Sequence, residues 1–225
     1  MVTKSTGPDE LLELDPGADP ALASYLRLMR LKRLYRQGWL KRGLPEALCE
    51  SVAEHSFGTA LLALLLAGRA GDCGDFGKLD SGKAALLALV HEMGESYAGD
   101  ITPVDGVSRE EKEALERDAI ARALEGHPDR GWLLSLWEEF EEGATPEAAF
   151  VRQLDRLEMG LQAALQEAEG FPGMGEFYDS ARRTVVEPRL RALLEEAIEA
   201  AGHARDGEGA PGSRRDAESG ALLRG

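Results

Sequence analysis

The apolar residues of this chain recur at helical spacing in a series of segments separated by glycine, proline and polar clusters. In segment 145–169, for example, the apolar positions lie three or four residues apart and define one stripe. No run of alternating apolar and polar residues is long enough for a sheet. The pattern therefore predicts an all-α fold, a single bundle of about six or seven helices. The helices that we expect span about residues 21–37, 44–67, 83–96, 108–124, 132–140, 145–169 and 176–201.

Several of these helices carry start signals in their local sequence. Asp19 followed by Pro20 is typical of an N-cap with proline at the first helical position. Ser108 and Glu111 have the spacing of a capping box, and Thr145 precedes a proline in the same way as Asp19. These signals predict helix starts near residues 20, 109 and 146.

The two ends of the chain differ from its middle in composition. Residues 1–18 are polar and acidic and are expected to form a flexible N-terminal arm. Residues 203–225 are rich in glycine, serine and charge and are expected to be a disordered C-terminal tail. We therefore expect one helical domain over residues 19–202.

Composition supports this picture and limits the possible partners. The 225 residues are 43% hydrophobic but only 6% aromatic, and alanine and leucine, which favour helices, are abundant. The net charge of −15 argues against binding of DNA or RNA polymers, although a single nucleotide is not excluded. Two cysteines without metal-binding spacing, and no apolar leader or membrane-spanning segment, lead us to expect a cytoplasmic protein.

Candidate chemistry begins where the apolar run 84–90 ends in His91, Glu92 and Glu95, with Asp100 shortly after. Such a position, at the edge of a core, can hold a ligand rigidly and still meet water. His91 and Glu95 are four residues apart and are expected to share one helix face. A zinc-protease helix is excluded, because it requires a second histidine where Glu95 stands. The alternative interpretation is a buried histidine beside solvated carboxylates.

Three further features have both an ordinary and a functional interpretation. His55 lies where segment 44–67 becomes apolar, which also suits a histidine packed in the core. Asp155 and Glu158 flank the stripe of segment 145–169, where solvation is the ordinary explanation. A basic cluster forms either a solvated helix face or an anion-binding patch. Its members are Arg30, Lys32, Arg33, Arg36, Lys41 and Arg42.

The order of these pieces resembles the HD-domain phosphohydrolases, and most closely the metal-dependent 5′-deoxynucleotidases. The resemblance covers about residues 25–170. It rests on Arg36-Gln-Gly-Trp39, Glu50-Ser-Val-Ala-Glu-His55-Ser56, His91-Glu92-Met-Gly-Glu95, Gly99-Asp100-Ile-Thr-Pro103 and Leu154-Asp155-Arg-Leu157.

The resemblance implies one divalent metal ion held by His55, His91, Glu92 and Asp155. Two imidazoles and two carboxylates suit Mn²⁺, Co²⁺, Fe²⁺ or Zn²⁺ better than Ca²⁺, and Mg²⁺ is a further candidate. The family has aspartate where this chain has Glu92. The additional methylene lets the carboxylate reach farther, and we expect the metal to be retained with a change in preferred ion or rate.

The resemblance also implies roles for the remaining site residues. Glu95 would orient or deprotonate the attacking water or assist the leaving group, and Arg36 would stabilise charge on the phosphoryl group. Asp100 would accept a hydrogen bond from the sugar 3′-hydroxyl. Trp39 would help to crowd out a ribose 2′-hydroxyl, and the turn containing Thr102 would fix Asp100. A homodimer is the implied assembly.

Three alternatives remain open at this point. The same fold could act on deoxynucleoside triphosphates or signalling nucleotides. A di-iron oxygenase would need additional histidines near the centre, and only His127 and His203 remain for that. A helical binding protein that has lost catalysis would explain Glu92 as a mark of decay.

Overall fold

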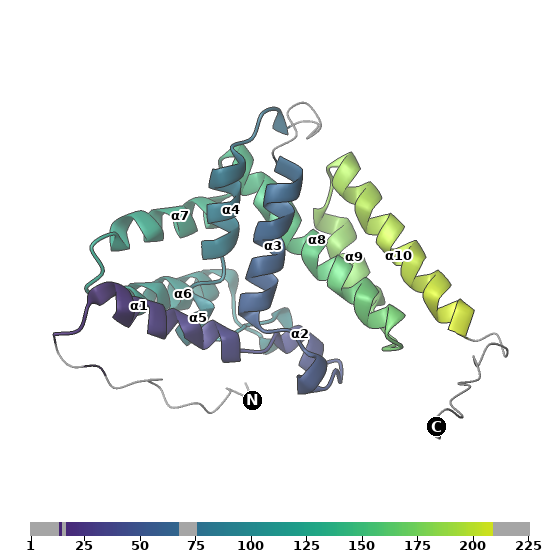
Figure 1. The fold of residues 1–225 in the computed structure, drawn as a ribbon, viewed down its shortest axis with the longest axis horizontal. Helices are drawn as coiled ribbons and strands as arrows, with labels where there is room; N and C mark the ends of the chain where they lie inside the picture. Colours follow the sequence, from purple (N-terminus) through teal and green to yellow (C-terminus); the bar gives the residue numbers. More distant parts are fainter. Residues whose placement is uncertain (1–13, 15–16, 68–75, 209–225) are drawn as a thin grey trace, which may run out of the picture.

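The computed structural model describes residues 14, 17–67 and 76–208, and the regular elements within them are helical (Figure 1). The one exception in this part of the chain is an isolated antiparallel bridge between Tyr35 and Ser51. The predicted all-α fold is therefore confirmed. The α-helices are α1 (Pro20–Leu28), α2 (Gln37–Leu40), α3 (Val52–Ala67), α4 (Ser81–Val90), α5 (Glu95–Ala98), α6 (Arg109–Ala123), α7 (Arg130–Glu142), α8 (Pro146–Ala168), α9 (Gly175–Thr184) and α10 (Pro188–Glu208), with 3-10 turns η1 (Met29–Arg33), η2 (Glu46–Leu48) and η4 (Pro103–Asp105).

Helices α3, α4 and α8 pack against one another in the middle of the molecule (Figure 1). Helices α9 and α10 lie against α8, and α7 packs on α4 and α8. The longest helix, α8, buries Phe150, Leu154 and Leu157 completely or nearly so, and Leu87 of α4 is buried in the same core. Burial of such side chains stabilises the fold by about 1.5–3 kcal/mol each. The candidate site residues lie where these three helices meet.

The prediction of one continuous helix over residues 21–37 is wrong. After α1 and η1 the chain becomes extended at Leu34, and α2 begins only at Gln37. The cause is pairing with a distant segment: Val52 N–H donates to the Leu34 carbonyl at 2.8 Å, and Arg36 N–H donates to the Glu50 carbonyl at 3.1 Å. For the same reason the helix predicted at 44–67 is replaced by η2, an extended stretch and α3.

The helix predicted at 83–96 is also divided. Helix α4 ends at Val90, a tight turn follows, and α5 begins at Glu95. Met93 N–H donates to the Val90 carbonyl at 3.0 Å, and α5 lies so close to α6 that a Cβ at Gly94 would be 2.5 Å from the Glu116 Cβ. As a consequence, the expected regular helix face shared by His91 and Glu95 does not form.

The C-terminal helix predicted at 176–201 is two helices, α9 and α10, separated at 185–187. Pro188 lacks a backbone N–H and suits the first helical position, so the chain restarts there. The side chain of Gln153 accepts hydrogen bonds from Val186 N–H at 2.8 Å and Glu187 N–H at 2.9 Å and fixes this break. Helix α10 continues to Glu208, beyond the expected domain boundary at 202.

The helix starts signalled by local sequence are confirmed. Asp19, Ser108 and Thr145 each accept a hydrogen bond from a backbone N–H of the first turn that follows. Apart from residues 14, 17 and 18, the expected arm at 1–18 lies outside the described residues, as does the tail from 209 onward. Within 17–67 and 76–208, no helix combines the length and the apolar character needed to cross a membrane.

Candidate metal centre and active site

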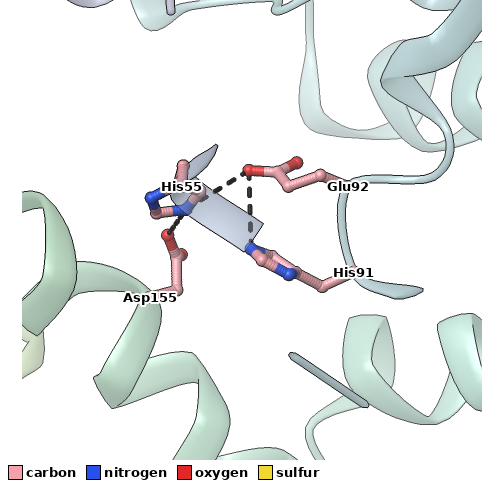
Figure 2. Close-up of side chains that lie close together, drawn as sticks. All are labelled: His55, His91, Glu92 and Asp155. Atoms are coloured by element: carbon pink, nitrogen blue, oxygen red, sulfur yellow. Dashed lines mark hydrogen bonds and ion pairs between the residues drawn. The ribbon is translucent and has the colours of Figure 1, made fainter. Parts of the chain in front are cut away.

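Four side chains from separate parts of the chain converge on one point, as Figure 2 shows. His55 comes from α3, His91 from the end of α4, Glu92 from the following turn and Asp155 from α8. Each offers one ligand atom, and these atoms all lie within 4.8 Å of one another. Nε2 of His55 is 3.2 Å from Asp155 Oδ1 and 3.8 Å from Glu92 Oε1.

His55 is completely buried, and both of its ring nitrogens contact carboxylates. Burial and the charge of Arg36 favour the neutral ring, but the hydrogen bonds to Asp155 and Glu158 outweigh them and raise the pKa of His55 to about 9. Without a cation, this acidic centre therefore favours the positively charged form of His55, with a proton on each ring nitrogen. A divalent cation would satisfy the same carboxylates.

His91 is held in the orientation that a metal ligand requires. Its Nδ1–H donates to the Ala88 carbonyl at 2.7 Å, while Nε2 is buried without a hydrogen-bond partner and lies 3.6 Å from Glu92 Oε1. Burial lowers the pKa of His91, so the ring is neutral and Nε2 carries a lone pair. An unpaired buried acceptor beside a carboxylate is costly, and a cation between them would remove that cost.

The two carboxylates of the group are ionised. Burial opposes this, but the permanent charge of Arg36, together with that of Lys112, lowers the pKa of Glu92 to about 2. Burial likewise opposes ionisation of Asp155, yet Arg156 and the hydrogen-bonded imidazole hold its pKa well below the usual range. Two imidazoles and two ionised carboxylates fit a borderline divalent cation. The tight turn after α4 allows the adjacent His91 and Glu92 to serve one centre.

Arg36 lies at the edge of this group. Its Nη1 is 3.1 Å from Glu92 Oε1 and 3.9 Å from Asp100 Oδ1. Burial opposes its charge, but Asp100 and Glu92 raise the pKa of Arg36 well above the ordinary value. Asp100 is itself fixed, because its Oδ2 accepts the Gln37 N–H at 2.6 Å. A permanent cation therefore lies beside the candidate centre.

Glu95 is the first residue of α5 and is only 1% exposed. Neither carboxyl oxygen has a hydrogen-bond partner, and the nearest cation is Lys112 of α6, whose Nζ is 3.9 Å from Oε1. Burial, followed by the charges of Glu92 and Asp100, raises the pKa of Glu95 well above its ordinary value. A carboxyl group with a raised pKa is suited to act as a general acid or base.

Trp39 does not project freely from the end of α2. The side chain is 2% exposed, its Nε1–H donates to Glu50 Oε1 at 2.9 Å, and its ring lies 4.0 Å from that of Phe177. In this arrangement Trp39 packs as a core residue beside the site. Its expected contact with a sugar stays a prediction.

Thr102 acts within the turn that follows Asp100. Its hydroxyl accepts from Lys41 Nζ at 2.6 Å and donates to Asp105 Oδ2 at 2.8 Å. Because Thr102 also caps η4, it stabilises the turn that follows Asp100. Its hydroxyl is occupied by these contacts.

The basic cluster does not form one anion-binding patch. Arg30 donates to a backbone carbonyl next to Tyr97, Lys41 pairs with Asp105, and Arg42 pairs with a glutamate of α9. Arg36 differs from these three because its guanidinium lies at the candidate centre. Lys32 and Arg33 of the same cluster are exposed on η1.

Sequence reasoning assigned no site role to two residues beside the centre, Glu158 and Lys112. Glu158 contacts His55, and Lys112 approaches Glu95. The spacing of Asp155 and Glu158, three residues apart on a predicted helix, is a signal that both share a face. Nothing in the local sequence indicates that α6 brings Lys112 to the site.

The remaining histidines do not extend the group. His127 lies in the turn before α7 and accepts from the Asp129 N–H through Nδ1 at 3.1 Å, and His203 is exposed on α10. Among the described residues, the side-chain groups able to hold a metal contain only His55 and His91 as histidines. The di-iron alternative therefore receives no support.

Comparison with known proteins shows the family to which the chain belongs. Residues 28–196 match the family model of the HD domain, so the chain belongs to the HD-domain family. It is 36% identical to the 5′-deoxynucleotidase HDDC2 of Mus musculus over 185 residues, covering 80% of this chain and 88% of that protein. The protein is accordingly an enzyme, a hydrolase, and the resemblance read from the sequence is confirmed.

Two solved structures have the same fold. A protein from Pyrococcus horikoshii OT3 is 32% identical with a TM-score of 0.64, covering 81% of this chain and 99% of that one. A predicted metal-dependent phosphohydrolase from Magnetospirillum magnetotacticum MS-1 is 26% identical with a TM-score of 0.62, covering 82% of this chain and 95% of that one.

Proposed function

We propose that this enzyme hydrolyses 2′-deoxynucleoside 5′-monophosphates to a deoxynucleoside and inorganic phosphate with the help of one divalent metal ion. The observation that carries the proposal is the group of His55, His91, Glu92 and Asp155, whose ligand atoms lie within 4.8 Å of one another. The similarity to 5′-deoxynucleotidases over most of the chain supports the substrate class.

These four residues would hold the metal ion, which would polarise the phosphate and lower the pKa of a coordinated water. Arg36 binds a phosphoryl oxygen and stabilises the charge that develops on it. Glu95, buried beside the centre with a raised pKa, moves a proton between the water and the leaving 5′-oxygen. No other proton carrier is needed for the net reaction.

The sugar would lie toward Asp100 and Trp39. The Gln37 N–H holds Oδ2 of Asp100, so that Oδ1 is directed toward Arg36. In this position Oδ1 accepts a hydrogen bond from the 3′-hydroxyl of the sugar. Trp39 and its neighbour Phe177 make this wall of the site bulky. A bulky wall beside the sugar disfavours a 2′-hydroxyl.

Monophosphates fit the site better than triphosphates. Additional phosphates would need further cations, and three of the five other members of the basic cluster, Arg30, Lys41 and Arg42, already have partners within the protein. The same reasoning argues against other polyphosphate substrates.

We also propose that the enzyme is a cytoplasmic homodimer. The outer face of α3 leaves Phe57 66% exposed together with Leu64 and Leu65, and an apolar face of this kind supports self-association. Sedimentation analysis of the purified protein tests the dimer, and a monomer at all concentrations would contradict it.

The proposed function is tested by measuring phosphate release from deoxy- and ribonucleoside mono- and triphosphates, each with Mn²⁺, Co²⁺, Mg²⁺ and Zn²⁺. The variants His55→Ala and Asp155→Ala should lose metal and activity together and keep a helical circular dichroism spectrum. Full metal occupancy in both variants would show that the ligands are others. A protein that binds metal but releases no phosphate from any deoxynucleoside monophosphate would refute the activity.

A further inference from the structure

Helix α8 contacts the imidazole of His55 from both sides. Asp155 Oδ1 lies 3.2 Å from Nε2, and Glu158 Oε2 lies 2.5 Å from Nδ1. The two acids are three residues apart and therefore share one face of the helix. Asp155 belongs to the four-residue group at the centre, whereas Glu158 lies on the opposite side of the ring.

Space for Glu158 is provided by Gly58 on α3. A Cβ at this position would lie 2.6 Å from Glu158 Oε1 and 3.1 Å from its Cγ. Glycine is an unfavourable residue in a helix interior, by about 1 kcal/mol relative to alanine. Its presence in α3, one turn after His55, leaves the path to Nδ1 open for the carboxylate.

The other histidine of the centre is oriented in the same sense. His91 Nδ1–H donates to the Ala88 carbonyl at 2.7 Å, and Nε2 faces the shared point. In His55 the backbone acceptor is replaced by the carboxylate of Glu158. Both rings thus have an acceptor at Nδ1 and present Nε2 to the centre.

We propose that Glu158 is a positioning residue that accepts the Nδ1–H of His55 and thereby fixes the ring with Nε2 toward the metal, an inference that rests on the metal centre of the proposed function. An acceptor at Nδ1 keeps the proton on that nitrogen and leaves the lone pair on Nε2. It also stops the ring from rotating away and makes Nε2 a stronger donor. Loss of such a partner typically weakens metal binding by about 10–100-fold.

A second metal site is the competing explanation, because Glu50, His55 and Glu158 also offer ligand atoms within 4.8 Å of one another. The contacts oppose it. Glu50 already accepts the Trp39 Nε1–H at 2.9 Å, and the 2.5 Å separation of Glu158 from Nδ1 leaves no room for an ion between them. The number of ions bound distinguishes the two explanations.

The experiment measures Co²⁺ affinity by competition with a chromophoric chelator, together with the visible spectrum and the number of ions bound. The variants are Glu158→Ala, Glu158→Gln and Gly58→Ala, and Glu169→Ala, an exposed acid near the end of the same helix, is the matched control. Gly58→Ala displaces the Glu158 carboxylate without changing any charge, and alanine favours the helix. Thermal melting of the metal-free proteins confirms that each variant is folded.

We expect the wild type to bind one ion and Glu158→Ala to bind it about 10–100-fold more weakly. Gly58→Ala should also bind more weakly. The loss in Glu158→Gln should be smaller, because its amide oxygen still accepts the hydrogen bond from Nδ1–H. Glu169→Ala should bind as the wild type does. Unchanged affinity in Glu158→Ala and Gly58→Ala would overturn the inference. Equal weakening in Glu158→Ala and Glu158→Gln, with Gly58→Ala at wild-type affinity, would assign the effect to charge and also overturn it.

Two ions in the wild type and one in Glu158→Ala would establish the second site instead. Because the measurement needs no nucleotide, a wild type that binds one ion but hydrolyses no deoxynucleotide would refute the proposed activity and leave this inference intact. A wild type that binds no Co²⁺ would overturn both.

Discussion

Proton and metal are expected to compete for His55. The acids that face its ring are Asp155 and Glu158 from α8, Glu92 from the turn after α4, and Glu50 from the stretch before α3. Arg36 and the His91 ring also lie close to it. Burial and Arg36 lower the pKa, but the acids prevail and raise it to about 9 in the protein without metal. A cation can coordinate Nε2 only after the proton has left.

The size of the effect follows from that pKa. At pH 7, about two units below it, about one molecule in a hundred has a neutral His55, so the apparent metal affinity is about 100-fold below its limit. Affinity should rise about tenfold per pH unit up to about pH 9. In the metal-free protein the raised pKa contributes stability that is present below about pH 6.5 and is lost as the pH rises through about 9.

Two measurements check this prediction. Chelator competition from about pH 6.5 to about 8.5 gives the slope, and calorimetry in buffers of different ionisation enthalpy counts the proton released. His127→Ala, which changes a histidine in the turn before α7, is the control and should leave the slope unchanged. An affinity that is constant over this range, with no proton released, would refute the reasoning.

Three further changes have defined outcomes. Glu92→Gln should weaken metal binding because a neutral amide replaces an anionic ligand. Glu92→Asp should retain the metal and change which ion gives the highest activity. If chelator competition gave the wild-type affinity for both variants, this residue would not be a metal ligand. Glu95→Gln should lower kcat by about 10²–10⁴-fold with metal content unchanged, and a wild-type kcat would exclude proton transfer by this carboxyl. Trp39→Ala should cost about 3–5 kcal/mol of unfolding free energy, because a buried ring and its contacts with Glu50 and Phe177 are lost. The same variant should narrow the ratio of kcat/KM for deoxy- over ribonucleotides if Trp39 walls the sugar, and a lower melting temperature with an unchanged ratio would make it a core residue only.

Much of the architecture could be predicted from short stretches of sequence. The helix starts after Asp19, Ser108 and Thr145 depend on a side chain that caps its own helix, so the local sequence contains all of the interaction. The all-α class depends on periodic apolar positions, which are also local. The four residues gathered at the centre were identified by resemblance, and the structure brings them together.

Helix ends were predicted less well because they depend on partners distant in sequence. The bend at Leu34 forms because its carbonyl accepts the Val52 N–H, eighteen positions later in the chain. The turn after His91 is associated with close packing of α5 on α6. In each case the apolar pattern continues through a point where the helix ends, because the helix end is set by hydrogen bonds and packing that form only in the folded chain.

The sequence by itself determined the class of fold, the helix starts and the identity of the side chains available to the centre, because these follow from local periodicity, capping and residue type. Only the tertiary structure decided which nitrogen of each histidine faces the centre. The acceptors that orient the rings are the Ala88 carbonyl for His91 and Glu158, from another helix, for His55. The tertiary structure likewise decided that Trp39 is buried against Phe177 and that Arg36, rather than its basic neighbours, lies at the centre. These outcomes depend on how α3, α4 and α8 pack, and packing is a property of the whole chain.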